Sequence, residues 1–257
     1  MAIAWARTRT QAQPLRIDVD AAQAGVQHLW EASAIDAQDW EVPTRGIVVG
    51  TLLNHRDDLL ALGDAVHAEP YLAPPRSPVL YIKPANTWIA HGAPIPLPAG
   101  MESLAMGGAL GIVIGIAATR VAPEQALQHV AGYTIVNDVH APNPTLLQPV
   151  LRERCRDGFC PIGPWVIERD AIADPDALSV RVLINGVECA ISTTANLVRS
   201  IATLIAHVSE CMTLSAGDVL LAGAPEAAPQ ARAGDRVRIE IDGVGALENT
   251  VVGETRP

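Results

Sequence analysis

The chain has 257 residues, of which 49% are hydrophobic, and its formal net charge is −10. This length allows one large domain, or one domain with a small appendage, and the hydrophobic fraction is ample for a core. The acidic balance argues against a nucleic-acid surface, which needs clustered Lys and Arg, but a local arginine cluster can still bind an anionic substrate.

Cysteine usage and hydropathy place the chain among reduced, non-membrane proteins. The four cysteines form no CxxC pair, which predicts buried free thiols in a reducing compartment: Cys155, Cys160, Cys189 and Cys211. No apolar run approaches the roughly 18 residues that cross a bilayer. Residues 1–13 contain Arg7 and Arg9 but lack the apolar stretch of a secretory signal. We therefore expect a cytoplasmic protein.

Residues 1–45 read as an N-terminal appendage that is partly helical, and residues 46–257 read as the main domain. Val26 and Trp30 lie at helical spacing in 21–33, with Asp20 as a candidate cap. The main domain begins with a continuous apolar run over 46–53, which predicts a strand buried on both faces.

The first half of the main domain alternates short strands with breakers. Residues 57–66 predict a helix, and the prolines of 70–78 predict an irregular loop. A short strand at 79–82 delivers Lys83 directly before Pro84. A lysine at such a strand end can pair with a substrate carboxylate, and the alternative is a surface lysine that extends its ammonium into water.

The middle of the chain predicts a strand, a short helix and a second strand. Residues 110–116 are continuously apolar. The helix at 122–131 has Pro123 in its first turn, and Gly132 is expected to end it. The strand at 132–139 then ends at an exposed acid, Asp138.

The last third predicts the longest helix and further strands. Residues 195–214 have one apolar stripe, with Thr193 or Thr194 as the cap. Strands are expected at 219–222 and, with alternating burial, at 236–241, and Asn185-Gly186 signals a hairpin. Many short strands with few helices predict a mixed β-rich α+β fold with helices on its flank.

Two polar clusters are candidate sites. Residues 54–58 (Asn-His-Arg-Asp-Asp) follow the first buried strand, where a site is favoured, although a solvated helix start explains them too. Residues 152–156 hold three arginines, which bind carboxylates in bidentate fashion. The alternative there is a surface loop whose arginines pair with Glu153 and Asp157.

Several motifs resemble the fumarylacetoacetate hydrolase family. They are Ile-Lys-Pro-x-Asn-Thr at 82–87, Asn-Asp-Val at 137–139 and Phe-Cys-Pro-Ile-Gly-Pro at 159–164. The resemblance covers about residues 46–253 and implies the fold of that family's C-terminal domain, a β-roll or sandwich with flanking helices. The family's general-base histidine falls at Asp58, so no base role is transferred to His55.

The resemblance also bears on a metal site. In the family a Glu-x-Glu pair and the aspartate of Asn-Asp-Val hold a divalent cation. Here the aspartate is Asp138, and the Glu positions fall on Gly107 and Ala109. This implies either a weak Mg²⁺ or Mn²⁺ site at Asp138 or a metal-free protein. The chain resembles the N-terminal half, or separate N-terminal subunit, of the isomerase/decarboxylases of homoprotocatechuate (4-hydroxyphenylacetate) degradation. That half similarly lacks the Glu pair.

Further residue roles are implied by the resemblance alone. The expected catalytic residues are Lys83, Arg154 and Asp157. The expected substrate-binding residues are Asn54, Arg56, Arg156 and Phe159.

Three functional hypotheses remain open. The chain is an active decarboxylase/isomerase component, a non-catalytic structural partner of a metal-bearing homologue, or a diacid-binding paralogue of another pathway. The expected ligand is a small di- or tricarboxylate. The expected protein partners are further copies of the chain, a metal-bearing C-terminal-type homologous subunit, or both, with no nucleic acid and no membrane.

Overall fold

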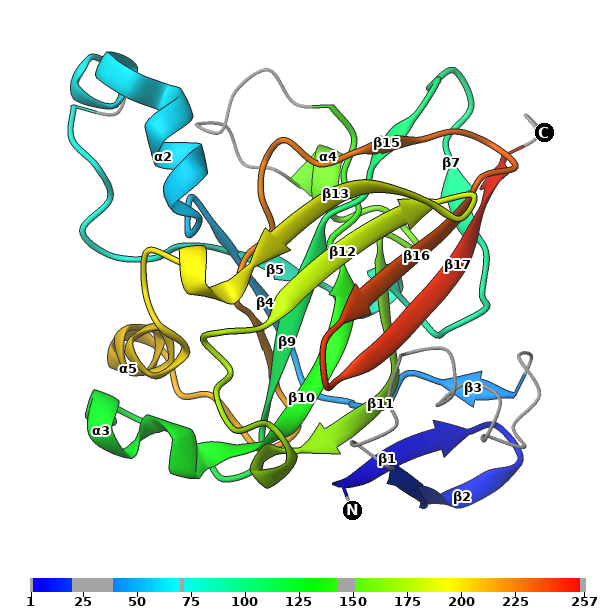
Figure 1. Ribbon diagram of the computed structural model, residues 1–257, viewed down its shortest axis with the longest axis horizontal. Helices are drawn as coiled ribbons and strands as arrows, with labels where there is room; N and C mark the ends of the chain where they lie inside the picture. The colour runs from blue at the N-terminus through cyan, green and yellow to red at the C-terminus, as the bar shows by residue number, and fades with distance from the viewer. Residues whose placement is uncertain (1, 20–38, 70–71, 143–150, 255–257) are drawn as a thin grey trace.

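The computed structural model of the chain describes residues 2–19, 39–69, 72–142 and 151–254. Their strands form a ten-stranded sheet, a five-stranded sheet and a two-stranded pair. The five-stranded sheet lies in front of the central strands of the larger sheet, and α3 and α5 lie to one side (Figure 1). The expected β-rich α+β class with flanking helices is confirmed.

The ten-stranded sheet has the order β2-β1-β11-β10-β9-β14-β4-β5, with β3 beside β1 and β6 beside β11. Its strands are β1 (Ala2–Thr8), β2 (Gln11–Val19), β3 (Trp40–Glu41), β4 (Val48–Leu52), β5 (Val79–Lys83), β6 (Trp88–Ile89), β9 (Gly108–Ile114), β10 (Val130–Asn137), β11 (Cys160–Glu168) and β14 (Val219–Leu221). The five-stranded sheet, in the order β13-β12-β16-β17-β7, contains β7 (Ile95–Leu97), β12 (Ser179–Ile184), β13 (Val187–Thr193), β16 (Arg236–Ile241) and β17 (Gly245–Gly253). The pair consists of β8 (Leu104–Ala105) and β15 (Gln230–Ala231).

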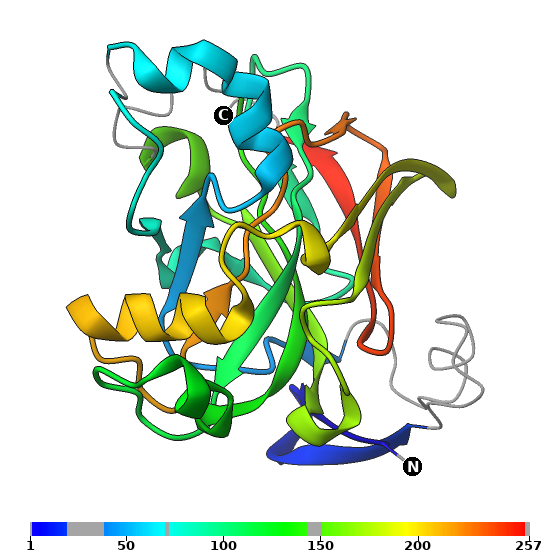
Figure 2. The same ribbon diagram turned by 60° about the vertical axis from the view of Figure 1, so that its left-hand side comes forward.

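The described helices are short. The α-helices are α2 (Arg56–Leu62), α3 (Pro123–Ala126), α4 (Leu151–Arg154) and α5 (Ile201–Cys211). The 3₁₀ turns are η1 (Gly63–His67), η2 (Ala85–Thr87), η3 (Leu127–His129), η4 (Arg169–Ala171) and η5 (Thr194–Asn196). Turning the molecule shows α5 lying along one side of the larger sheet, with α3 below it (Figure 2). None of these described helices is long and apolar enough to cross a membrane.

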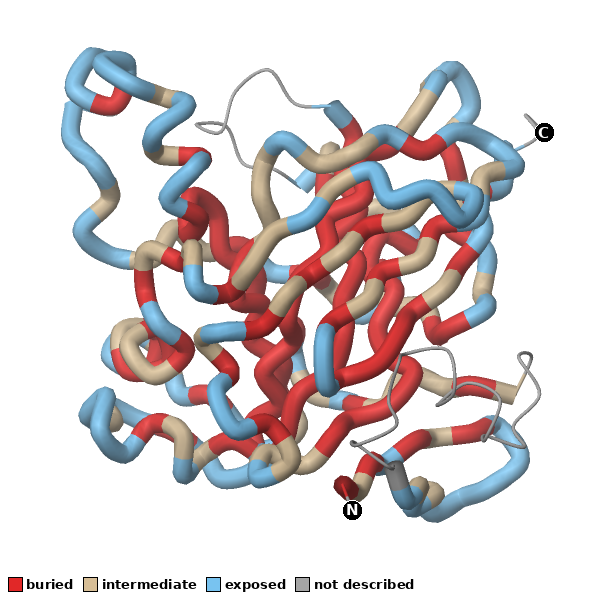
Figure 3. Tube along the Cα trace, viewed as in Figure 1, coloured by how far each residue is buried: buried red, intermediate tan, exposed pale blue. Residues whose placement is uncertain are grey.

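The central strands are buried on both faces. Every residue of β4 and β9 is buried, as their continuous apolar runs predict (Figure 3). Along β9, Ile112 belongs to the main core with residues of the smaller sheet and α5, whereas Val113 belongs to a second cluster. This alternation follows from the two-residue period of a strand. The strands predicted at 46–53, 79–82, 110–116, 132–139, 219–222 and 236–241 are present as β4, β5, β9, β10, β14 and β16.

The N-terminal strands extend the larger sheet. β1 pairs with β11 in antiparallel register, with Ala4 opposite Ile167, and β2 and β3 pair with β1. Only a helix at 21–33 is predicted in this part of the chain, and those residues lie outside the described ranges. The strands were missed because the inward positions Ala2, Ala4 and Ala6 are small and carry little hydrophobic signal.

The longest described helix begins later than predicted. Ser200 caps α5, its hydroxyl accepting from the N–H of Thr203 at 3.3 Å, whereas Thr193 caps only the preceding 3₁₀ turn. The N–H of Val198 donates to the carbonyl oxygen of Asn54 (2.8 Å), which holds this stretch extended. A tertiary contact therefore replaces the helical hydrogen bonds that the apolar stripe predicted.

Gly132 does not end a helix, contrary to the prediction. The helical stretch stops at His129, and Gly132 lies inside β10 next to a register irregularity. A Cβ at this position would lie 2.0 Å from the carbonyl oxygen of Ile167 on β11. The glycine is needed for the close approach of two strands.

The prediction of buried free thiols is confirmed only in part. All four cysteines are free, but Cys189 and Cys211 are exposed.

We expect Gly132→Ala to destabilise the protein by at least about 2 kcal/mol, because the neighbouring backbone has no room for the added methyl group. The matched control is Gly253→Ala in β17, where the nearest atom to a new Cβ is 3.6 Å away. Urea denaturation of the two variants measures the difference. Equal stabilities would show that the β10–β11 spacing described here is wrong.

Candidate functional site

Asp138 lies at the centre of a buried group of charges, directly after β10. Its N–H donates to the carbonyl oxygen of Gly107 (2.8 Å), which places it beside the start of β9. Its Oδ1 lies 2.8 Å from Nζ of Lys83, and its Oδ2 lies 2.5 Å from Nη1 of Arg154. Oδ2 also accepts a hydrogen bond from the Tyr81 hydroxyl. Both carboxylate oxygens are therefore engaged by groups of this chain.

Lys83 is fully buried at the end of β5. Strand alternation turns Tyr81 and Lys83 inward and leaves Ile82 51% exposed. Besides its ion pair with Oδ1 of Asp138, the ammonium donates to three carbonyl oxygens at 2.8–2.9 Å, those of Val139, Arg154 and Phe159. A lysine ammonium has three protons, and the three carbonyl oxygens account for all of them. Lys83 is therefore not a surface lysine. Its ammonium is also not free to bind a substrate carboxylate, because the protein already occupies it.

Arg154 joins Asp138 to a second carboxylate. Its Nη2 lies 3.2 Å from both carboxylate oxygens of Glu226. The guanidinium carbon lies 5.0 Å from the ring centre of Tyr81, a cation–π arrangement. The Arg154 side chain is 5% exposed and that of Glu226 is 25% exposed, so this balance of two cations and two carboxylates reaches from the interior to a partly exposed acid.

The pKa values in this group follow from burial and charge. Burial alone would raise the pKa of Asp138, but Lys83 and Arg154 outweigh it and hold that pKa well below its usual range. Burial raises the pKa of the Tyr81 phenol well above its ordinary value, so Tyr81 remains a neutral donor. Asp138 is thus a permanent anion at neutral pH.

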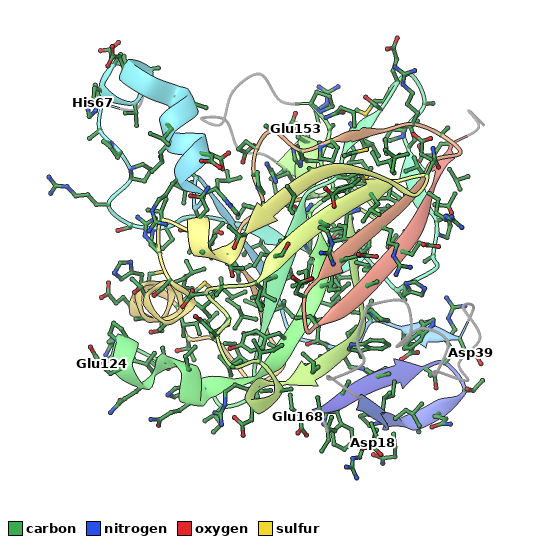
Figure 4. The ribbon with its side chains drawn as sticks, viewed as in Figure 1. Asp18, Asp39, His67, Glu124, Glu153 and Glu168 are labelled. Carbon is green, nitrogen blue, oxygen red and sulfur yellow. The ribbon has the colours of Figure 1, made fainter. Side chains whose placement is uncertain are left out.

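The charged group contrasts with the many charged side chains that lie at the surface. Residues such as His67, Glu124 and Glu168 lie at the periphery of the molecule (Figure 4). Such exposed charges contribute little to stability. A buried ion pair has a large desolvation cost, and removal of one partner leaves an uncompensated charge. The contacts of Asp138 therefore tie together the ends of β5 and β10 and the segment before β11.

Gly107, the position at which the resemblance places the family's first glutamate, lies against Asp138. A Cβ on Gly107 would lie 2.9 Å from the carbonyl oxygen of Asp138 and 3.1 Å from Cβ of Ala224. Ala109 is two residues further along, buried in β9 opposite Val136. The layout of a carboxylate cluster is present, but two of its three carboxylates are missing.

The residues present do not fit a divalent cation. Mg²⁺ requires about six oxygen ligands, usually including carboxylates. Within the described residues no three His, Cys, Asp or Glu side chains are grouped to hold a metal. A cation bound to Asp138 would also meet the positive charges of Lys83 and Arg154, which already neutralise that carboxylate. We therefore assign no metal ligand role to Asp138.

A cavity of about 300 Å³ lies next to this group. Gly107, Asp57, Asp58 and Ser192 line it, together with apolar residues of β12, β13 and the 225–229 segment. Glu226 connects the two features, because its carboxylate holds Arg154 and its N–H donates to Oδ1 of Asp58 (3.0 Å). Glu226 thus links the Asp138 group to the wall of the cavity.

The predicted residues Asn54 and Arg56 make structural contacts. Asn54 is buried, and its Nδ2 donates to the carbonyl oxygen of Ala222 (2.7 Å), just before the Gly-Ala-Pro segment at 223–225. Arg56 is exposed, and its Nη1 donates to the carbonyl oxygen of Ala195 (2.9 Å). Neither side chain joins the Asp138 group.

The remaining predicted residues are also separate from that group. Asp157 is exposed and accepts from Nδ2 of Asn86 (2.6 Å), while Nε of Arg156 donates to the carbonyl oxygen of Arg152 (2.8 Å). The Phe159 side chain is fully buried in the core, and only its carbonyl oxygen reaches Lys83. Of the expected catalytic and metal residues, the structure brings together Lys83, Arg154 and Asp138.

Sequence reasoning missed Tyr81 and Glu226. Tyr81 precedes Lys83 by two residues, so strand alternation could have placed it on the same face. Glu226 follows the Gly-Ala-Pro segment, but its pairing with Arg154 joins residues 72 positions apart. No local pattern signals that contact.

Comparison with known proteins identifies the family. The model of the fumarylacetoacetate (FAA) hydrolase C-terminal domain matches residues 47–252. The chain belongs to the FAA hydrolase family. The 4-hydroxyphenylacetate degradation bifunctional isomerase/decarboxylase of Escherichia coli is 41% identical over 210 residues, covering 82% of this chain and 48% of that protein. The chain spans about half the length of the curated relatives of this kind.

Solved structures of FAA hydrolase relatives have the same fold. A 2-hydroxyhepta-2,4-diene-1,7-dioate isomerase from Mycobacterium marinum is 26% identical with a TM-score of 0.76, covering 100% of both chains. A maleylpyruvate hydrolase from Sphingobium sp. SYK-6, solved with manganese (II) and pyruvate, is 27% identical with a TM-score of 0.70 and covers 94% of this chain and 78% of its own. A relative with this fold has thus been solved with Mn²⁺ bound.

We expect Asp138→Asn to lower the free energy of unfolding by about 3–5 kcal/mol, because Lys83 and Arg154 lose their buried counter-ion. Adding Lys83→Met to this variant should restore part of the loss. Urea denaturation at neutral pH measures both effects. The control Asp157→Asn, which changes an exposed carboxylate, should cost less than about 1 kcal/mol. A loss as small as this for Asp138→Asn would contradict the assigned ion pairs.

Proposed function

We propose that this chain is one component of an isomerase/decarboxylase that acts on small oxo-acids released during 4-hydroxyphenylacetate breakdown. The proposed substrates are 5-oxopent-3-ene-1,2,5-tricarboxylate, which loses CO₂, and 2-hydroxyhepta-2,4-diene-1,7-dioate, which is isomerised. The observation that carries the proposal is 41% identity, over 82% of this chain, to an E. coli enzyme named for this chemistry. The full-length match to a 2-hydroxyhepta-2,4-diene-1,7-dioate isomerase supports it.

The charges around Asp138 bear on which unit of the assembly carries out decarboxylation. Loss of CO₂ from a β-keto-type acid leaves an enolate, whose charge a divalent ion can stabilise as a Lewis acid. The donors beside Asp138 do not fit such an ion. We therefore propose that decarboxylation takes place in an assembly with a homologous unit that carries the Glu-x-Glu pair. The E. coli relative, of which this chain covers 48%, is long enough to contain a second unit.

A second candidate function is a structural partner without catalysis of its own. The observation that favours it is the full engagement of Lys83, whose ammonium contacts four oxygens and has no exposed surface. In that role the chain would stabilise or position the metal-bearing unit. The two candidates differ in whether the chain alone turns over any substrate.

The test is a set of assays on the purified chain, on a homologue with the Glu-x-Glu pair, and on their mixture. CO₂ release from the tricarboxylate and ultraviolet absorbance of the dioate follow the two reactions. A matched homologue with both glutamates changed to Gln controls for mere mixing. We expect the chain alone to isomerise the dioate in the presence of EDTA, and CO₂ release to require the unmodified homologue.

Three other outcomes are informative. If the mixture is faster than the homologue alone but the chain alone is inactive on both substrates, the structural-partner function replaces the proposal. If the chain binds diacids but neither associates with the homologue nor changes its rates, the chain belongs to another pathway. CO₂ release by the chain alone in EDTA would contradict the proposed division of labour.

A further inference from the structure

Two adjoining pockets lie where β7 and the end of β17 meet the 156–159 segment. β7 runs beside the end of β17 (Figure 1). The pockets have volumes of about 540 and 270 Å³, and Pro96, Asp157 and Glu254 line both of them. Neither has a lining residue in common with the cavity beside Gly107. We refer to the two pockets together as the β7 groove.

The larger pocket of the β7 groove has a mostly apolar lining. Pro94 and Pro96 line it together with Ile89 and Val252. Residues two apart along a strand face the same side, so the two proline rings form one apolar surface. Gly158 has φ +73°, and a Cβ on it would lie 2.5 Å from Cδ of Pro96. The glycine therefore allows the 156–159 segment to lie directly against the prolines.

The smaller pocket contains a cation that no described residue neutralises. Arg156 lines this pocket and is partly buried. Its Nε donates to the carbonyl oxygen of Arg152 (2.8 Å), which orients the guanidinium. Among the described residues, its two Nη groups have neither an ion-pair nor a hydrogen-bond partner. A guanidinium can bind one carboxylate with two N–H groups, so Arg156 can accept a ligand carboxylate.

Two acids accompany this arginine in the β7 groove. Asp157 accepts from Nδ2 of Asn86 through Oδ1 (2.6 Å), and its Oδ2 has no partner in the described part of the chain. Glu254 is exposed, and its N–H donates to the carbonyl oxygen of Leu97 (2.9 Å), which fixes its backbone beside β7. The described lining thus carries one positive and two negative charges. A simple carboxylate would be repelled by the acids, and a simple amine would be repelled by Arg156.

We propose that the β7 groove binds a free α-amino acid with an apolar or aromatic side chain. The carboxylate of the ligand pairs with Arg156, its ammonium pairs with Asp157 and Glu254, and its side chain packs against the proline rings. An α-amino acid has both charged groups on one carbon, which matches a lining of mixed charge beside an apolar surface. The proposal is independent of the proposed function, because it uses neither the cavity beside Gly107 nor the charges around Asp138.

The test is an NMR titration of the ¹⁵N-labelled chain with four small molecules. L-phenylalanine has all three features of the proposed ligand. 3-Phenylpropionate lacks the ammonium, 2-phenylethylamine lacks the carboxylate, and L-alanine lacks the large side chain. We expect L-phenylalanine to bind with a Kd of about 1 mM, as suits a small ligand in an open groove, and each analogue to bind at least about tenfold more weakly.

Three variants locate the binding site. Arg156→Gln should weaken L-phenylalanine binding at least about tenfold, because the carboxylate loses its charged partner. The matched control is Arg76→Gln, which changes an exposed arginine outside the groove and should bind like the wild type. Glu254→Gln should weaken L-phenylalanine binding and strengthen 3-phenylpropionate binding, because it removes a charge that attracts the ammonium and repels the carboxylate. Thermal unfolding midpoints confirm that the variants are folded.

Three results would overturn the proposal. The first is no binding of L-phenylalanine up to about 10 mM. The second is wild-type binding of 3-phenylpropionate or 2-phenylethylamine as tightly as L-phenylalanine, which would indicate a site for a single charge. The third is L-phenylalanine binding that neither Arg156→Gln nor Glu254→Gln changes, which would place the ligand elsewhere on the chain.

Discussion

The rest of the site depends on one buried carboxylate, that of Asp138, and on the two cations that hold it. Lys83 comes from β5, Arg154 from the segment before β11, and Asp138 from the end of β10. Each of these charges would be strongly unfavourable alone in the interior, and together they are stable only in a narrow geometry. The ends of β5 and β10 and the helix α4 are therefore held in fixed relation, and Glu226 extends the same network to the wall of the cavity.

This arrangement gives an account of how a family scaffold can do without the Glu pair. Gly107 leaves the space beside Asp138 without a side chain, and the cations of the chain neutralise the remaining acid. A separate cavity, lined by Asp58 and mostly by apolar residues, adjoins Gly107, and the N–H of Glu226 donates to Asp58 at its wall. Lys83 thus serves the charge balance at Asp138 and has no exposed surface to offer a ligand.

Local patterns predicted the strands well and the contacts less well. The apolar run at 46–53, the alternation at 236–241 and the hairpin at Asn185-Gly186 depend on neighbours in the chain, and the structure has β4, β16 and the β12–β13 turn there. The prediction for Gly132 was wrong because its role depends on β11, 35 residues away. The predicted start of α5 was wrong because the Asn54 carbonyl oxygen holds Val198 outside the helix. Lys83, Asp138 and Arg154 were singled out individually, but their saturation by one another depends on distant pairings that no local pattern contains.

The central claim is that protein cations, and not a divalent metal, neutralise Asp138. Electron paramagnetic resonance of Mn²⁺ titrated into the metal-stripped chain tests it directly, since bound Mn²⁺ loses the six-line signal of the free ion. The account predicts that all Mn²⁺ stays free up to about 1 mM, because one carboxylate already paired with two cations is a poor site. Binding of one Mn²⁺ per chain at about 10 µM, abolished by Asp138→Asn, would contradict it.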